Sequence, residues 1–296
     1  MADNGVAPTR RKAVLRRILS GIAGVLVLAY AAACVLLYFQ QDHMVFPGPP
    51  QHYKATSPAD AGLAFEDMHI PVNASDQIHA WWIPAASPSS KVLLYFHGNG
   101  YCIEQTAGAI EEVGALHSLG ANVLMADYIG YGASSPGQAN EQRVYEGARA
   151  ALDYLTGQRK IPIHDIVMVG RSIGTGPATE LAKENPNAAA LILVSAFTSV
   201  TDLANTIWYV RLMPLSLMEH NPMNNLAKIG AVHIPAFLTV GSEDTLTPPA
   251  MAQALLAKAN DPKRLFIVLG ADHNAMFKIG VKEMTEQMRS FLQTIH

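Results

Sequence analysis

Ser172 has the sequence surroundings of a nucleophile. It lies in the pentapeptide GRSIG at residues 170–174, between a buried-type apolar run at residues 166–169 and a helical pattern from residue 174 onwards. A nucleophile at a strand-to-helix turn needs small neighbours, because the backbone there is strained and larger side chains would collide. The turn also places the hydroxyl at a helix N-terminus, where backbone amides favour developing negative charge. A G-x-S-x-G string without this context is often only a glycine-rich turn.

An acid and a base follow Ser172 in the chain. A serine hydroxyl becomes nucleophilic when an imidazole removes its proton and a carboxylate fixes the tautomer of that imidazole. Asp244 ends the segment GSED after the apolar run 236–240, and His273 lies in GADHN after the run 265–269. The order serine, acid, histidine is one that hydrolases use. We predict Asp244 as the acid and His273 as the base, with Glu243 as the alternative acid.

An oxyanion hole needs two backbone N–H donors aimed at one point. The amide of Ile173 is one candidate, since it follows the nucleophile directly. The segment FHGNG at residues 96–100 ends another apolar run, and we expect the amide of Asn99 to be the second donor, with Gly100 as the alternative. The side chain of His97 is interpreted as a brace for this loop.

Other chemistries lack the residues they need. The chain has no H-E-x-x-H and no cysteine–histidine cluster, so we expect neither a metal site nor a cofactor. Cys102 lies close to the oxyanion loop but has no base placed for it, and it is interpreted as a small buried residue. The net charge of −3 and the lack of a basic stripe outside the N-terminus argue against a nucleic-acid partner.

The elements that position these residues alternate between strand and helix. Runs at 64–72 and 78–84 predict an antiparallel pair with a turn at 73–76. Near-continuous apolar runs typical of strands buried on both faces follow at 91–96, 122–127, 166–169, 190–195, 236–240 and 265–269. Helical patterns lie at 104–118, 141–155, 174–185, 249–259 and 281–292. This alternation predicts an α/β fold with a mostly parallel sheet, helices on both faces, and chemistry at the carboxyl ends of the strands.

The segments HGNG, DYIGYGASSPG, GRSIGTGPA, GSEDTLTPP and GADHN together resemble the α/β-hydrolase superfamily. The resemblance is specifically to its membrane-anchored Bem46-like branch, with the α/β-hydrolase domain-containing proteins 13 and 17, and it covers nearly the whole chain. It implies the triad Ser172, Asp244 and His273 and hydrolysis of acyl esters or thioesters. Ile129 departs from the arginine common in the family, so substrate class does not carry over.

The N-terminus predicts a membrane anchor. Five basic residues between 10 and 17 precede an uncharged apolar stretch at 18–39, long enough for a hydrocarbon core of about 30 Å. The positive-inside rule then predicts a cytoplasmic tail at 1–17 and a catalytic domain on the other side of the membrane. The residues after Cys34 stay apolar, which favours an uncleaved helix; a cleaved signal peptide or a lipoprotein acylated at Cys34 remains the alternative. Residues 40–62 are rich in proline and glutamine and are expected to be a linker before the catalytic domain at 63–296.

A segment at about 196–232 is predicted to form a short cap. It contains Trp208, Tyr209, Leu212 and Met213, which are apolar residues suited either to the core or to a wall around an acyl chain. The leading prediction is a serine esterase or thioesterase acting on a small-molecule or lipid-like acyl substrate. A serine aminopeptidase-like peptidase and a non-catalytic membrane-anchored binding protein are the alternatives. The sequence does not determine the oligomeric state.

Overall fold

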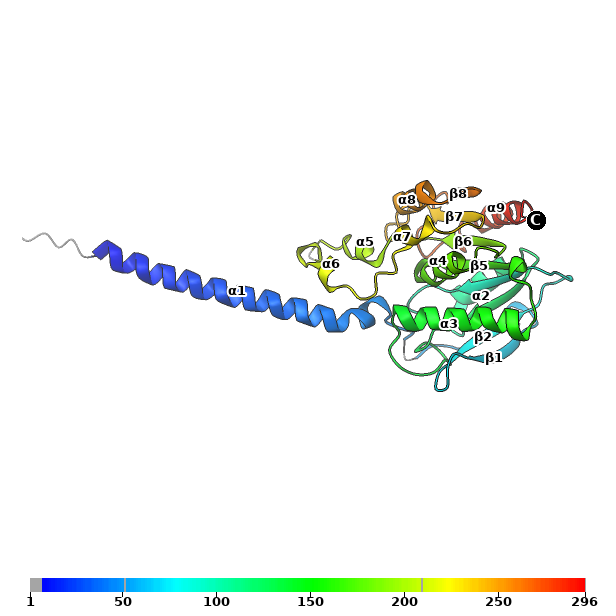
Figure 1. Ribbon diagram of the computed structural model, residues 1–296, viewed down its shortest axis with the longest axis horizontal. Helices are drawn as coiled ribbons and strands as arrows, with labels where there is room; N and C mark the ends of the chain where they lie inside the picture. The colour runs from blue at the N-terminus through cyan, green and yellow to red at the C-terminus, as the bar shows by residue number, and fades with distance from the viewer. Residues whose placement is uncertain (1–6, 51, 209, 296) are drawn as a thin grey trace, which may run out of the picture.

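The computed structural model describes residues 7–50, 52–208 and 210–295. Its centre is one eight-stranded sheet with the strand order β1-β2-β4-β3-β5-β6-β7-β8, and Figure 1 shows the sheet between two layers of helices. The strands are β1 (Glu66–Pro71), β2 (Gln77–Ile83), β3 (Val92–Phe96), β4 (Asn122–Ala126), β5 (Ile166–Arg171), β6 (Ala190–Val194), β7 (Ala236–Gly241) and β8 (Lys263–Val268). The sequence-based prediction of a mostly parallel α/β sheet is therefore confirmed.

The sheet is antiparallel only at its N-terminal edge. Strand β2 pairs antiparallel with both β1 and β4, and the later pairs from β4 through β8 are parallel. The β1–β2 turn is closed by the Asn73 side chain, whose oxygen accepts from the amides of Ser75 and Asp76 at 2.9 Å. This is the Asx arrangement that favours Asn at turns.

The inner strands β3 and β5 to β7 are buried on both sides because both faces of the sheet are covered. Leu94 and Phe96 of β3 point into one core, while Leu93 and Tyr95 point into the other. Helices α3 (Glu141–Asp153), α4 (Thr175–Glu184) and α8 (Pro249–Lys258) pack on the first face; α2 (Thr106–His117) and α9 (Val281–Leu292) pack on the second. The parallel register brings the ends of β3, β5, β7 and β8 to one edge, where the loops with the predicted site residues lie.

Helix α1 (Ala7–Val45) is longer than the predicted membrane segment at 18–39. Within the described residues, one helical stretch, Lys12–Val45, is long and apolar enough to cross a membrane. The helix continues to Val45, and Phe46, directly after it, is buried in the core of the catalytic domain and accepts from Gln138 Nε2 at 3.1 Å. The connection into the domain is thus made at residue 46, and Figure 1 shows α1 projecting away from it as a rod.

The predicted cap contains α5 (Val200–Ala204), α6 (Leu215–Met218) and α7 (Asn225–Ile229). In Figure 1, α5 and α6 extend from the domain beside the C-terminal part of α1. Tyr209 of the predicted cap and residues 1–6 of the predicted tail lie outside the described residues.

Candidate active site

Ser172 lies on a sharp turn between β5 and α4. Its φ is +51°, in the left-handed region that a serine adopts only when its surroundings impose it. A side chain at Gly174 would bring Cβ to 2.1 Å from the carbonyl oxygen of Phe96, and one at Gly170 would lie 2.3 Å from the carbonyl oxygen of Gly174. Both glycines are therefore required by close backbone approach, as the sequence pattern predicted.

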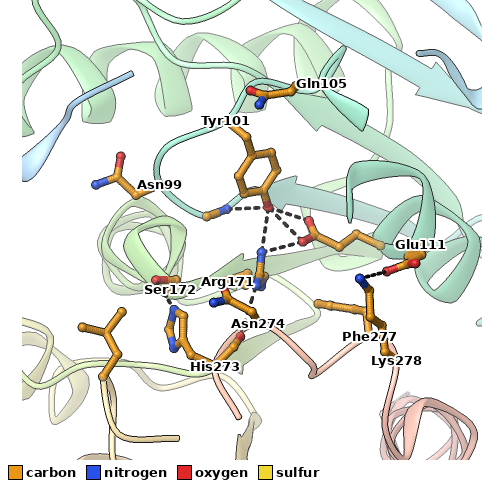
Figure 2. A pocket seen from close by; sticks show the side chains of 13 residues that line it. Asn99, Tyr101, Gln105, Glu111, Arg171, Ser172, His273, Asn274, Phe277 and Lys278 are labelled. Atoms are coloured by element: carbon orange, nitrogen blue, oxygen red, sulfur yellow. Dashed lines mark hydrogen bonds and ion pairs between the residues drawn. The ribbon is translucent and has the colours of Figure 1, made fainter. Parts of the chain in front are cut away.

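The structure brings Ser172, His273 and Asp244 into one hydrogen-bonded chain. His273 Nε2 lies 2.9 Å from Ser172 Oγ, and His273 Nδ1 lies 2.8 Å from Asp244 Oδ2. Figure 2 shows the imidazole next to the serine hydroxyl. These distances are within the range that nucleophile–base and base–acid contacts require.

Asp244 is held ionised by its neighbours. Burial acts to raise the pKa of its carboxyl, but the hydrogen bonds and charge of His273 and the bonds from Thr247 outweigh burial and lower that pKa. The amide and the hydroxyl of Thr247 donate to the two carboxylate oxygens at 2.7 and 2.8 Å, and the amide of Leu246 donates at 3.0 Å. The alternative acid, Glu243, is exposed and makes no such contact with His273 in the described structure.

The loop after β3 holds both candidates for the second oxyanion donor. The amide of Gly100 donates to the side-chain oxygen of Asn99 at 3.0 Å, and the amide of Gly98 donates to Tyr101 Oη at 3.0 Å. The amides on either side of Asn99 thus have hydrogen-bond partners within the loop. Asn99 and Ser172 line the same pocket.

The Asn99 side chain ties this loop to the end of α1. Its Nδ2 donates to the carbonyl oxygen of Val45 at 2.5 Å, and its Oδ1 accepts from Tyr131 Oη at 2.6 Å. The position of the loop therefore depends on where helix α1 ends. The sequence contains no local signal for this contact, because Val45 and Asn99 are far apart in the chain.

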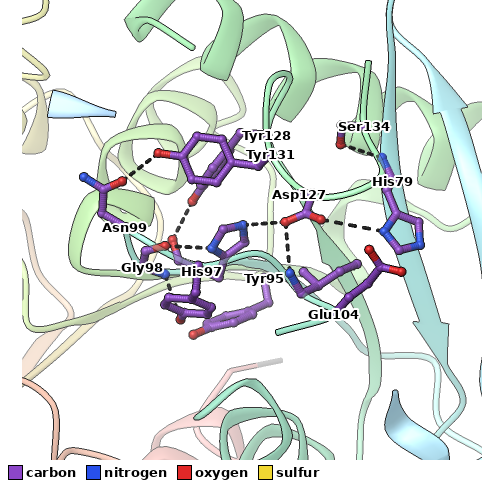
Figure 3. A network of polar contacts seen from close by, with 12 residues as sticks. His79, Tyr95, His97, Gly98, Asn99, Glu104, Asp127, Tyr128, Tyr131 and Ser134 are labelled. Carbon is purple, nitrogen blue, oxygen red and sulfur yellow. Dashed lines mark hydrogen bonds and ion pairs between the residues drawn. The ribbon is translucent and has the colours of Figure 1, made fainter. Parts of the chain in front are cut away.

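His97 is the brace that the sequence predicted. It is fully buried, with Nε2 3.0 Å from Asp127 Oδ1 and Nδ1 2.7 Å from the carbonyl oxygen of Gly98. Figure 3 shows Asp127 between His97 and His79. Burial acts to raise the pKa of Asp127, but its bonds with the two histidines outweigh burial and lower it.

A buried ion pair beside the nucleophile was missed by sequence reasoning. Arg171 Nη1 lies 2.6 Å from Glu112 Oε1, and both side chains are almost fully buried. Glu112 also accepts from Tyr95 Oη at 2.5 Å and from Tyr101 Oη at 2.7 Å, while Arg171 Nη2 donates to the His273 carbonyl at 3.2 Å (Figure 2). The sequence did contain one signal for this pair, because Arg171 is a charged residue at the end of an apolar strand.

The pocket over Ser172 has a volume of about 380 Å³, and charged and apolar side chains both line it. Lys278 Nζ and Glu111 Oε2 lie 3.7 Å apart at its rim, and both side chains are partly exposed. Phe277 and Leu246 supply apolar surface.

Cys102 does not compete with Ser172 as a nucleophile. It is buried, and burial followed by the nearby charge of Asp127 raises the pKa of its thiol to about 11. A thiol with such a pKa is almost entirely protonated near neutrality and so is a poor nucleophile. Cys102 and Cys34 are both free thiols.

Sequence comparison places this geometry in a family. Residues 91–213 match the family model described as the alpha/beta hydrolase fold. The chain is 30% identical to the alpha/beta hydrolase domain-containing protein WAV2 of Arabidopsis thaliana, over 83% of this chain and 84% of that protein. It is also 30% identical to the human alpha/beta hydrolase domain-containing protein 17B, over 70% of this chain and 68% of that protein. The chain belongs to the α/β-hydrolase family.

A solved structure agrees with this assignment. An esterase from Pyrococcus furiosus superposes on this α/β-hydrolase with a TM-score of 0.72 at 19% identity, covering 84% of this chain and 97% of the esterase. At that identity the likeness concerns the fold. The relatives at 30% identity confirm the family resemblance drawn from the sequence motifs, and family membership supports a hydrolytic activity.

Proposed function

We propose that this α/β-hydrolase is a membrane-anchored serine hydrolase of the carboxylesterase or thioesterase type. The observation that carries the proposal is the continuous chain of contacts from Ser172 through His273 to Asp244, at 2.9 and 2.8 Å. The substrate is an acyl ester or thioester, and the intermediate is an acyl-enzyme on Ser172.

In the proposed reaction, Ser172 Oγ attacks the carbonyl carbon while its proton passes to His273 Nε2. The carbonyl oxygen becomes an oxyanion that accepts hydrogen bonds from the amides of Ile173 and Asn99. The intermediate collapses, the bond to the leaving oxygen or sulfur breaks, and His273 gives its proton to the leaving group. Water then attacks the acyl-enzyme with His273 as the base, which releases the acid and restores Ser172. Asp244 stays ionised throughout and holds the imidazole in its tautomer.

An apolar acyl group suits the surroundings of this site. A groove with almost entirely apolar surface lies between the end of α1 and the cap, with Leu37, Met44, Ala204 and Leu215 among its lining residues. Burying a CH₂ group in such a groove contributes about 0.8 kcal/mol. Val45 lines this groove, and its carbonyl oxygen accepts from Asn99 of the pocket over Ser172, so one hydrogen bond links the two linings.

The carboxylates near Ser172 argue against the peptidase alternative. An aminopeptidase needs an acidic group free to bind the substrate amine. Both oxygens of Glu112 are bonded to Tyr101, and one is also paired with Arg171. Glu111 is paired with Lys278.

Labelling with a fluorophosphonate tests the proposal. The wild-type protein is expected to be labelled covalently, and folded Ser172→Ala is expected to be unlabelled and inactive on p-nitrophenyl esters. Ser195→Ala is a matched control, because Ser195 directly follows the neighbouring strand β6 with the same positive φ of 51° and a buried hydroxyl that has no partner among the described residues. Undiminished labelling of Ser172→Ala would refute the proposal.

A further inference from the structure

The end of the cap farthest from the sheet exposes large apolar side chains. We call residues 207–208 and 210–213 the cap tip. The relative exposures are 41% for Ile207, 75% for Trp208 and 66% for Leu212. Three large apolar side chains exposed within so short a stretch form an unusual surface for a protein surrounded only by water.

The cap tip lies against the apolar segment of α1. Tyr30 Oη donates to the carbonyl oxygen of Leu212 at 2.8 Å, and Cys34 Sγ lies 3.6 Å from Met213 Sδ. Tyr30 precedes Phe39 by nine residues, which is roughly 13 Å along the helix axis. Figure 1 shows the cap reaching along α1. A bilayer crossed by this part of α1 therefore also meets the cap tip.

The contacts between α1 and the cap become more strongly polar along the helix towards the catalytic domain. Towards the catalytic domain, Gln41 Nε2 donates to the carbonyl oxygen of Met218 at 2.8 Å. Asp42 Oδ1 there lies 3.0 Å from His220 Nε2 and accepts from Asn221 Nδ2 at 2.6 Å. On the far side of this group, at residues 30–34, the contacts are one hydroxyl–carbonyl hydrogen bond and one sulfur–sulfur contact, and neither involves a charged side chain. This order fits a membrane–water boundary between the two sets of contacts, because hydrocarbon accommodates polar groups only where they bond to one another.

The aromatic and basic residues of the cap tip fit the same boundary. Tryptophan is enriched at membrane interfaces, where its ring is buried and its N–H remains near polar groups. Arg211, the one charged residue of the tip, is exposed and donates from Nε to the carbonyl oxygen of Asn205. An arginine at this level reaches lipid phosphates through its long side chain.

We propose that the cap tip enters the lipid leaflet beside α1 and is a second membrane-contacting surface of this protein. Its partner is a phospholipid bilayer. The lining of the groove between α1 and the cap includes Leu37, which lies between the two sets of contacts, so in this proposal an acyl chain reaches the groove from the membrane rather than from water. The contact surface rests on α1 crossing the bilayer and does not depend on the reactivity of Ser172.

Tryptophan fluorescence of the full-length protein in lipid nanodiscs tests the contact. The chain has three tryptophans, and Trp81 and Trp82 are buried at 2% and 8% exposure, so Trp208 is the one able to meet lipid. The tryptophan emission is measured in nanodiscs of phosphatidylcholine whose acyl chains carry bromine close to the headgroup. It is compared with the emission in nanodiscs of unbrominated lipid. We expect quenching in the wild type, its loss in Trp208→Phe, and its retention in Trp82→Phe. Equal emission from wild type in both lipids would place the cap tip in water and overturn the proposal.

A second measurement distinguishes this proposal from the proposed function. Trp208→Asp is expected to lower hydrolysis of a long-chain ester carried in vesicles several-fold, while hydrolysis of a short water-soluble ester stays unchanged. An equal effect on both esters would contradict a role in reaching membrane substrates. Hydrolysis of neither ester by the wild type would refute the proposed function, whereas the quenching result would still decide the lipid contact.

Discussion

Arg171 Nη2 donates to the backbone carbonyl oxygen of His273 at 3.2 Å, so the residue before the proposed nucleophile holds the loop that carries the proposed base. The same guanidinium is paired with the buried carboxylate of Glu112. Two loops from distant parts of the chain are thus fixed relative to each other by one side chain. The 2.9 Å contact between His273 and Ser172 depends on that arrangement.

Substitution of Arg171 is expected to impair both stability and catalysis. Arg171→Met leaves the Glu112 carboxylate buried without its charged partner, and breaking a buried pair in this way costs about 3–5 kcal/mol. Chemical denaturation gives the free energy of unfolding. Arg149→Met is the matched control, because its pair with Glu184 is partly exposed and worth less than about 1 kcal/mol. Arg171→Lys keeps the positive charge but loses the planar guanidinium, which donates to Glu112 and to the His273 carbonyl at the same time. We expect this variant to lower kcat roughly tenfold. Equal stability of Arg171→Met and Arg149→Met would contradict this account.

Asp244→Asn is expected to lower kcat by about 10⁴, because an amide in place of the carboxylate favours the wrong tautomer of His273. Glu243→Gln serves as the neighbouring control and is expected to change kcat little, since the Glu243 side chain is exposed. Steady-state kinetics on a p-nitrophenyl ester measures both. If Glu243→Gln lost activity and Asp244→Asn kept it, Glu243 would be the acid of the triad.

The buried carboxylate of Asp127 predicts part of the acid sensitivity of the fold. Its pKa is lowered in the folded protein from the ordinary value of 3.8, so the folded state favours the ionised form more than the unfolded state does. The contribution of the Asp127 carboxylate to the free energy of unfolding is complete above pH 3.8. It is lost as the pH falls through the lowered pKa of this group in the folded state. We expect Asp127→Asn to be less stable at neutral pH and to lose less stability than wild type on acidification below about pH 4. Urea unfolding from pH 7 to 3 measures this, with Glu286→Gln as a surface control. Parallel pH profiles for wild type and Asp127→Asn would refute it.

We predict the orientation of the anchor from its flanking charges. Five basic residues precede Ile18 and none lies between residues 40 and 53, so the N-terminus is expected in the cytoplasm and the hydrolase domain on the opposite side. In a Gram-negative bacterium, protease added to spheroplasts would then digest the domain, and alkaline carbonate would not extract the intact protein. A domain protected until the cells are lysed would reverse the orientation. A mature N-terminus at Cys34 would show that the segment is removed or acylated.

Several features were predictable from sequence because they depend on neighbouring residues. Apolar runs of strand length mark β3 through β8, since strands covered on both faces require apolar side chains on both sides. The glycines around Ser172 mark the turn, because a Cβ at Gly174 would meet the carbonyl of Phe96. The order of Ser172, Asp244 and His273 at successive strand ends predicts that they meet, since parallel strands bring their carboxyl ends to one edge of the sheet.

Only the tertiary structure determined which distant side chains contact one another. The pairing of Arg171 with Glu112 has no local pattern, because a buried ion pair depends on two elements packing face to face. The same holds for the contact between Asn99 and Val45, which couples the oxyanion loop to the end of α1. The position of Leu212 beside Tyr30 is likewise set by how the cap folds against the helix. Hydrophobic periodicity specifies which face of an element is buried, whereas the partner across that face is decided by packing.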